Sequence, residues 1–121
     1  MKKLLPVLAL VAVVGMAFTF AGKSIVGTWN AMYGMGAPGK VTFRSNGTYE
    51  AEYTGQGWKV GGKYKQDGNT ATITDSICGF GYWAKYTSKW ASDDSVTFTV
   101  VTDTCSGRKA SANGMVLVRQ K

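Results

Sequence analysis

Apolar and polar residues alternate along most of the chain after its first 21 residues, a period-two pattern that is typical of half-buried β-strands. In the segment 48–54, Tyr49, Ala51 and Tyr53 fall on one side, and the polar residues between them fall on the other. The segment 95–100 repeats the pattern, with Val and Phe alternating with Ser and Thr. Helical periodicity is absent from this part of the chain, so we expect a fold made of strands.

Clusters of Gly, Asn and Asp separate these segments at intervals of about 8 to 14 residues. Ser45-Asn46-Gly47 and Asp67-Gly68-Asn69 are typical of tight hairpin turns, because these residue types tolerate a positive φ. The segment Cys105 to Ala112 is compatible with one helical turn or with a loop. The pattern predicts about eight strands, over Ser24–Tyr33, Gly39–Arg44, Thr48–Thr54, Trp58–Lys65, Thr70–Thr74, Phe80–Lys89, Ser95–Thr102 and Met115–Gln120. Because an exposed sheet edge invites aggregation, we expect these strands to close into a small all-β, antiparallel up-and-down barrel.

The N-terminal segment follows a different pattern, that of an export signal. Two lysines precede an apolar run from Leu4 to Phe20, and small residues up to Ala21 stand where a signal peptidase cleaves. We therefore expect a signal peptide over 1–21 and a single barrel domain over 22–121, located in the periplasm or outside the cell. A retained membrane anchor is the alternative interpretation of the apolar run.

Cys78 and Cys105 are the only cysteines of the chain. In an oxidising compartment an even number of cysteines favours a disulfide over two free thiols. Closing a loop of about 28 residues would stabilise the fold by about 3 to 4 kcal/mol. Neither a metal site nor a cofactor is expected, because the chain has no histidine and two cysteines alone do not make a zinc site.

The chain carries a net charge of +7, and removal of Lys2 and Lys3 with the signal leaves 12 basic and 7 acidic residues, a net charge of +5. The basic residues are scattered and never form a run longer than two. Such scattering is typical of a solvated surface, not of a nucleic-acid interface. We expect no nucleic-acid partner, and contact with a membrane only through an uncleaved signal.

Catalytic residue combinations are poorly represented, so the sequence predicts a protein that is not an enzyme. The chain lacks histidine, both cysteines are expected to be oxidised, and Asp93 and Asp94 fall in an expected turn. Glu50 and Glu52 share a strand side about 7 Å apart, a spacing that would suit inverting glycoside hydrolysis. Acidic residues on the solvent side of a strand are far more common than a catalytic pair, which favours a surface role for both.

Several segments resemble, in their order, those of small exported bacterial lipocalin-like domains. They are the Gly-x-Trp opening within Ile25-Val26-Gly27-Thr28-Trp29, the segments 41–49 and 68–74, and a Cys-x-Gly-Arg element over Cys105–Arg108, before the last strand. The resemblance covers nearly the whole mature chain and implies a β-barrel that often binds a small apolar molecule. It also implies a structural role for Gly27, Trp29 and Arg119, in which the tryptophan packs at the closed end of the barrel beneath the arginine. Such a cation–π contact contributes about 0.5 to 2 kcal/mol.

An eight-stranded barrel is either filled by its own side chains or just wide enough for one small ligand. The large residues expected to point inward are Tyr49, Tyr53, Phe80, Tyr82, Tyr86 and Phe98. In the first functional hypothesis, the protein carries a small hydrophobic or amphipathic molecule in a cavity of about 300 Å³ or more. The predicted ligand-binding residues are Tyr49, Tyr53, Tyr82, Tyr86 and Phe98, with Met35 of the glycine-rich loop adding an adaptable apolar contact.

In the second hypothesis the core is filled and the barrel acts as a protein-interaction module, for example an inhibitor of a hydrolase or an accessory of an envelope protein. The predicted contact surface contains Trp58, Trp83 and Trp90, since exposed aromatic side chains mark interaction sites. Trp83 alternates with Tyr82 and Tyr86 and is therefore expected outside the barrel. A shift of one residue in strand register would turn it inward.

Overall fold

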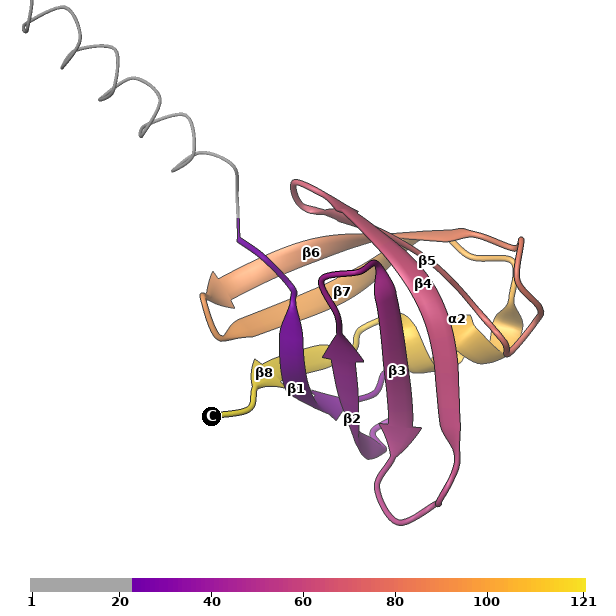
Figure 1. Ribbon diagram of the computed structural model, residues 1–121, viewed down its shortest axis with the longest axis horizontal. Coiled ribbons are helices and arrows are strands. Elements are labelled where there is room, and N and C mark those ends of the chain that lie inside the picture. Colours follow the sequence, from indigo (N-terminus) through magenta and orange to yellow (C-terminus); the bar gives the residue numbers. More distant parts are fainter. Residues whose placement is uncertain (1–22) are drawn as a thin grey trace, which may run out of the picture.

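The computed structural model describes residues 23–121, so the predicted signal peptide and its cleavage site lie outside the described residues. Eight antiparallel strands form a closed barrel in which each strand pairs with its neighbours in sequence and β1 pairs with β8 (Figure 1). The elements are β1 (Gly27–Met32), β2 (Pro38–Phe43), β3 (Thr48–Tyr53), β4 (Lys59–Asp67), β5 (Thr70–Asp75), β6 (Ala84–Ser92), β7 (Ser95–Thr102), α2 (Ser106–Ala112) and β8 (Val116–Arg119). The predicted all-β up-and-down barrel is confirmed. Between residues 23 and 121, no helix is long and apolar enough to cross a membrane.

The barrel has two ends that differ in structure. The connections after β1, β3, β5 and β7 meet at one end, which we call the helix end because α2 lies there. The connections after β2, β4 and β6 meet at the opposite end, which we call the tryptophan end because Trp29 lies there. Helix α2 buries Arg108 and Ala112, one helical turn apart on one side. The N–H of Gly34 in the β1–β2 connection donates to the Ser111 carbonyl at 2.8 Å. Of the two forms that the sequence allowed for this segment, the helix is the one observed.

Trp29 closes the tryptophan end. Its side chain is fully buried, and its indole N–H donates to the Ile25 carbonyl at 2.9 Å. The Arg119 guanidinium lies 4.2 Å from the centre of the Trp29 ring, so the predicted contact between these residues is present. Gly27 has a φ of +139°, and a Cβ at this position would lie 2.8 Å from an Arg119 nitrogen. Glycine at position 27 therefore gives the arginine the space that it occupies over the tryptophan.

Strand β6 begins later than predicted, at Ala84 and not at Phe80. Gly79 and Gly81 have φ values of +91° and +106°, and these left-handed conformations interrupt an extended strand. Phe80 and Tyr82 consequently lie in the β5–β6 loop, where their side chains are 59% and 60% exposed. The prediction that these two side chains point into the barrel is wrong.

Trp90 is also placed differently from its predicted surface position. Within β6 the inward side is taken by Ala84, Tyr86, Ser88 and Trp90, every second residue. The Trp90 ring packs against the core and meets the Trp29 ring edge-on, with 6.0 Å between ring centres. Because Trp90 has the same phase as the buried Tyr86, it belongs to the barrel interior, and its assignment to a partner surface is wrong.

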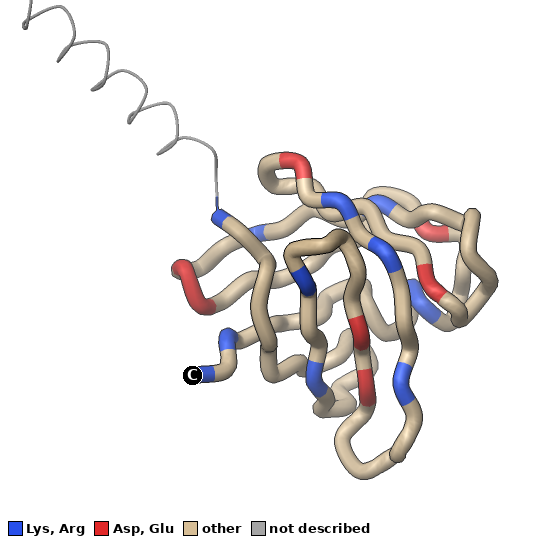
Figure 2. The backbone as a smooth tube through the Cα atoms, in the orientation of Figure 1, with Lys and Arg blue, Asp and Glu red and all other residues tan. Residues whose placement is uncertain are grey.

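The predicted disulfide is present between Cys78 and Cys105, whose Cα atoms are 5.8 Å apart. It joins the β5–β6 loop to the residue that precedes α2, and so ties two connections of the helix end together. A disulfide of this kind is consistent with an oxidising, exported location. Lysine and arginine residues are spread over several strands of the barrel, as the sequence predicted (Figure 2).

Candidate ligand-binding site

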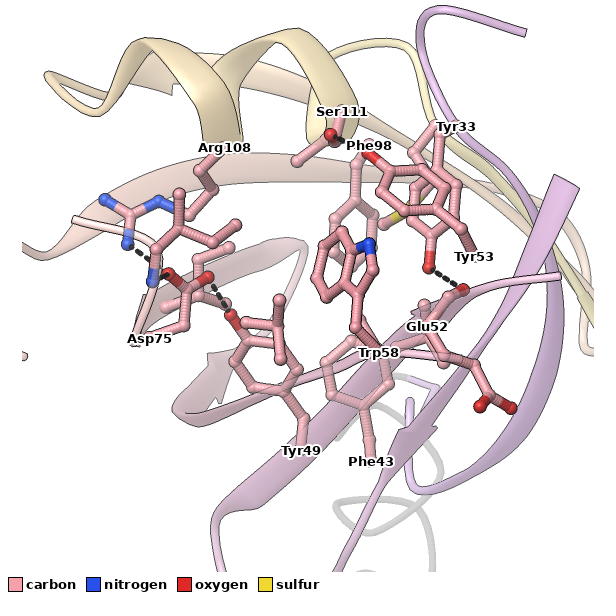
Figure 3. Close-up of a pocket in the computed structure, with 17 residues that line it drawn as sticks. Tyr33, Phe43, Tyr49, Glu52, Tyr53, Trp58, Asp75, Phe98, Arg108 and Ser111 are labelled. Atoms are coloured by element: carbon pink, nitrogen blue, oxygen red, sulfur yellow. Dashed lines mark hydrogen bonds and ion pairs between the residues drawn. The ribbon is translucent and has the colours of Figure 1, made fainter. Parts of the chain in front are cut away.

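A small pocket lies at the helix end, between strands β2 to β5, strand β7 and helix α2. Its cavity volume is about 60 Å³. Aromatic rings form much of the lining (Figure 3), and they belong to Tyr33, Phe43, Tyr49, Tyr53, Trp58 and Phe98. A site of this composition suits an apolar group of a ligand.

The strand pattern explains how the wall of the pocket is built. Tyr49, Ala51 and Tyr53 lie on the inward side of β3, as their spacing predicts. Val41 and Phe43 of β2 pair in register with Ala51 and Tyr49, so the two strands present one continuous apolar surface. Ala51 is the smallest of these five side chains and leaves space between its larger neighbours.

Three of the predicted ligand-binding residues line this pocket, and three do not. Tyr49, Tyr53 and Phe98 belong to its wall. Tyr86 is buried but lies outside the lining, whereas Tyr82 and Met35 are exposed and contribute nothing to it. The sequence therefore identifies the aromatic wall on β3 and β7, but not the extent of the pocket.

Trp58, which was predicted on an exposed contact surface, is exposed and lies at the mouth of the pocket. Its side chain is 44% exposed, and its ring meets the Tyr53 ring edge-on, with 5.1 Å between centres. The Tyr53 hydroxyl is hydrogen-bonded to the Ser111 hydroxyl, which joins β3 to α2. Trp58 and this link between β3 and α2 border the opening (Figure 3).

Tyr33 packs against the same rim. Its ring centre lies 4.6 Å from that of Tyr53, and its hydroxyl donates to the Glu52 carbonyl at 2.7 Å. Burial, assisted by the neighbouring Tyr53, raises the pKa of Tyr33 to about 12. The Tyr33 phenol is therefore neutral over the physiological pH range and acts as a hydrogen-bond donor.

Two charged side chains, Arg108 and Asp75, belong to the lining of the pocket, and Asp103 lies behind them. The Arg108 guanidinium binds Asp103 through two nitrogens, each 3.0 Å from a carboxylate oxygen. A third nitrogen lies 3.4 Å from Asp75, and the arginine also donates to the Tyr82 carbonyl at 2.8 Å. The side chains of Arg108, Asp75 and Asp103 are 2%, 3% and 0% exposed. These three residues form a buried ionic cluster, which we call the ionic floor.

Two tyrosines donate hydrogen bonds to the ionic floor. The Tyr49 hydroxyl donates to Asp75, and the Tyr86 hydroxyl donates to Asp103. Burial, reinforced by the adjacent carboxylates, raises the pKa of both phenols well above the usual value of about 10. Both hydroxyl groups are therefore held in the neutral, donating form.

Opposing effects act on the charged members of the cluster. Burial raises the pKa of the Asp103 carboxyl, but hydrogen bonds from Arg108 and Tyr86 outweigh it, and the pKa falls below its usual value. Burial likewise disfavours the charged form of Arg108, but the two carboxylates outweigh it and raise the pKa of the guanidinium. Arg108 and Asp103 are therefore an ion pair at neutral pH.

The ionic floor was not predicted from the sequence, although two signals point to it. Asp75 has the same phase on β5 as the inward residues Ala71 and Ile73, so a carboxylate falls on a buried strand side. Arg108 belongs to the Cys-x-Gly-Arg element over residues 105–108. A buried acidic position of this kind requires a partner, and the partner lies in the helix.

Other candidate chemistry is not supported by the geometry. Glu50 lies 3.6 Å from Arg44 and 3.5 Å from Lys59, in ion pairs on the partly exposed side of β3. Over residues 23–121 no group of three or more His, Cys, Asp or Glu side chains is arranged to hold a metal ion. The pocket and its ionic floor are therefore the strongest candidate site in the described part of the chain.

A second surface at the helix end exposes aromatic residues to solvent. Besides Phe80 and Tyr82, the β5–β6 loop presents Ile77 and Trp83, which are 42% and 41% exposed. The Lys65 ammonium lies 5.2 Å from the centre of the Trp83 ring. Trp83 is thus exposed outside the barrel, as predicted, although it lies in the loop before β6 and not on the strand from which its phase was inferred.

Comparison of the chain with models of known protein families, with curated proteins and with solved structures gives no match.

Proposed function

We propose that this chain is an exported, non-catalytic, lipocalin-like protein that binds a small hydrophobic or amphipathic molecule in the pocket at the helix end. The observation that carries the proposal is the pocket itself, in which an aromatic wall faces a buried ionic floor. An apolar wall supplies affinity through the hydrophobic effect, and a few fixed polar groups orient the guest. The contact of Arg119 with Trp29 supports the lipocalin-like assignment, and the disulfide supports a periplasmic or secreted location.

The size of the pocket limits the ligand. The cavity volume of about 60 Å³ is smaller than the 300 Å³ or more that the sequence-based hypothesis expected and that is typical of ligand sites, so the expected size is wrong. Such a cavity holds only one small apolar group, because a cavity that accepts a benzene ring measures about 150 Å³, and a larger guest requires the mouth to widen. Because the half-exposed Trp58 ring occupies the mouth, its outward displacement would enlarge the space and admit a longer guest.

An NMR titration tests the proposal. Addition of 2-phenylethanol to the isotope-labelled exported protein is expected to shift the resonances of Val41, Ile73 and Met115 saturably. An Ala51→Phe variant, which fills the pocket, is expected to lose this response. A Thr99→Phe variant, which adds the same ring on the exposed side of β7, serves as the matched control and is expected to retain it. An absence of saturable shifts in the unmodified protein, or equal responses in both variants, would refute the proposed site.

The exposed aromatic residues of the β5–β6 loop favour a second candidate function, that of a protein-interaction module in the cell envelope. Phe80, Tyr82 and Trp83 are exposed in one loop, which the disulfide at Cys78 joins to the residue before α2, and exposed aromatic side chains mark interaction sites. On this hypothesis, Trp83→Ala weakens capture of an envelope protein but changes the free energy of unfolding by less than about 1 kcal/mol. Unchanged capture by this variant would argue against the second function.

A further inference from the structure

The charges around the pocket do not balance. The charged residues among its lining are Glu52, Asp75 and Arg108, and the guanidinium of Arg108 is also paired with Asp103 behind the wall. The ionic floor alone contains two carboxylates and one guanidinium. With these groups ionised, the buried cluster has one negative charge in excess.

The hydrogen bonds of the cluster indicate that the excess negative charge lies on Asp75. Asp103 takes two nitrogens of the Arg108 guanidinium at 3.0 Å, whereas Asp75 has a single, longer contact with it at 3.4 Å. The other donors to Asp75 are neutral: the hydroxyl of Tyr49 and the backbone N–H of Ile77, the latter at 3.1 Å. Asp75 therefore lies at the pocket with its charge only partly compensated (Figure 3).

The rest of the wall suits a positive charge. Aromatic faces attract a cation through the ring quadrupole, most strongly where water is excluded. The rings of Tyr49, Phe43 and Tyr53 belong to the same lining as Asp75. The buried carboxylate is a counter-ion for a bound cation. Because the surrounding rings lower the local dielectric constant, the attraction between the carboxylate and the cation is stronger than in water.

We propose that the pocket selects organic cations, so that its ligand is a small apolar molecule bearing an ammonium group that pairs with Asp75. This inference rests on the proposed function and specifies its ligand class. A carboxylate ligand is disfavoured because the guanidinium of Arg108 is already committed to Asp103, Asp75 and the Tyr82 carbonyl. The positive net charge of the protein disfavours the binding of cations to the rest of its surface. A measured preference for a cationic ligand therefore has to arise in the pocket.

Isothermal titration of three matched probes tests the inference. Phenethylamine, 2-phenylethanol and phenylacetate share one apolar body and differ in the charge at its end. At pH 7 the exported protein is expected to bind the amine at least about tenfold more tightly than the alcohol, since a hydrogen bond to a charged group is stronger than a neutral one. Phenylacetate is expected to bind most weakly.

Asp75→Asn is the informative variant, because it removes the excess charge and leaves the Arg108–Asp103 pair intact. It is expected to bind the alcohol as before and to reduce the preference for the amine to less than about threefold. Asp67→Asn, at an exposed position of β4, is the matched control and is expected to keep the full preference. If Asp75→Asn does not fold, the affinities of the unmodified protein for the three probes decide whether the pocket prefers cations.

Each outcome separates the two proposals. Equal affinity for the amine and the alcohol, or tightest binding of phenylacetate, would overturn the cation preference and leave a binding site for small apolar molecules. A preference for the amine that persists in Asp75→Asn would overturn the role of that carboxylate. Failure of all three probes to bind would overturn the proposed function together with the inference that rests on it.

Discussion

The guanidinium of Arg119 lies over Trp29, 4.2 Å from the ring centre, and it also binds the chain that precedes β1. Its nitrogens donate to the carbonyls of Val26 at 2.9 Å and of Ser24 at 3.1 Å. One residue near the end of the chain therefore fixes the first described segment onto the barrel. This arrangement explains why the tryptophan end is closed while the pocket lies at the other end.

Replacement of Arg119 is expected to weaken the closed end. Arg119→Ala removes the cation–π contact and several hydrogen bonds, and we expect it to lower the free energy of unfolding by about 1 to 3 kcal/mol. Arg119→Lys keeps the charge but not the planar donor group, so it should recover only part of the loss. Urea denaturation followed by tryptophan fluorescence measures both. Full stability of Arg119→Ala would show that the contact is incidental.

Gly62 and Gly61 offer a matched pair on β4. A Cβ at Gly62 would lie 2.4 Å from the Tyr49 ring and 2.5 Å from the Thr74 carbonyl oxygen, whereas a Cβ at Gly61 would meet open space. Gly62→Ala is therefore expected to destabilise the barrel by about 1 to 3 kcal/mol through overpacking. Gly61→Ala should change the stability by less than about 0.5 kcal/mol. Equal effects of the two substitutions on thermal unfolding would contradict this packing.

Removal of the disulfide is expected to lower stability without changing the fold. The bond between Cys78 and Cys105 closes a loop with a sequence separation of 27. On the chain-entropy model its loss in a Cys78→Ser, Cys105→Ser double variant costs about 3 to 4 kcal/mol. Denaturation with and without reductant measures the effect: reductant should destabilise the natural chain and leave the double variant unaffected. A natural chain that is insensitive to complete reduction would contradict this stabilising role.

Acid is expected to weaken the ionic floor through Asp103. Its pKa is lower in the folded protein than the value of about 3.9 expected after unfolding. The stabilisation from its ionised form is thus fully present above about pH 4 and is lost as the pH falls through the folded value. Asp103→Asn should be less stable than the natural chain at pH 7, and the difference should shrink below about pH 4.

Urea denaturation at a series of pH values between neutrality and about pH 2 measures this dependence. Asp67→Asn, which changes an exposed carboxylate of β4, is the control and should follow the curve of the natural chain. A constant difference between the natural chain and Asp103→Asn over the whole pH series would show that ionisation of Asp103 does not stabilise the fold.

Local patterns were sufficient to predict most of the barrel. Period-two alternation predicted β3 and β7, and turn residues such as Asn46 and Gly47 predicted the hairpin between β2 and β3. The start of β6 was misplaced because alternation of aromatic residues continues through Phe80 and Tyr82 into a loop. The positive φ values of Gly79 and Gly81 prevent β6 from beginning before Ala84. The alternation of apolar residues carries no information about these backbone angles.

The candidate site was only partly predictable, because its parts come from distant segments. The aromatic wall follows from the strand period, but the pairing of Arg108 with Asp75 and Asp103 joins α2 to the ends of β5 and β7. Those contacts depend on how the chain crosses the helix end. Trp58 shows the same limitation, since its contact with Tyr53 at the pocket depends on the conformation of the β3–β4 loop, which strand periodicity does not predict.

Native mass spectrometry of the protein, purified from its own host, tests the central proposal most directly. The protein is expected to retain a reproducible small molecule that leaves on denaturation, and the Ala51→Phe variant, with its pocket filled, is expected not to retain it. Identification of the released compound would also show whether it carries an ammonium group. If neither the natural protein nor Ala51→Phe retains a bound molecule, so that their masses differ only by the substitution, the binding function is contradicted. The interaction surface of the β5–β6 loop is then favoured.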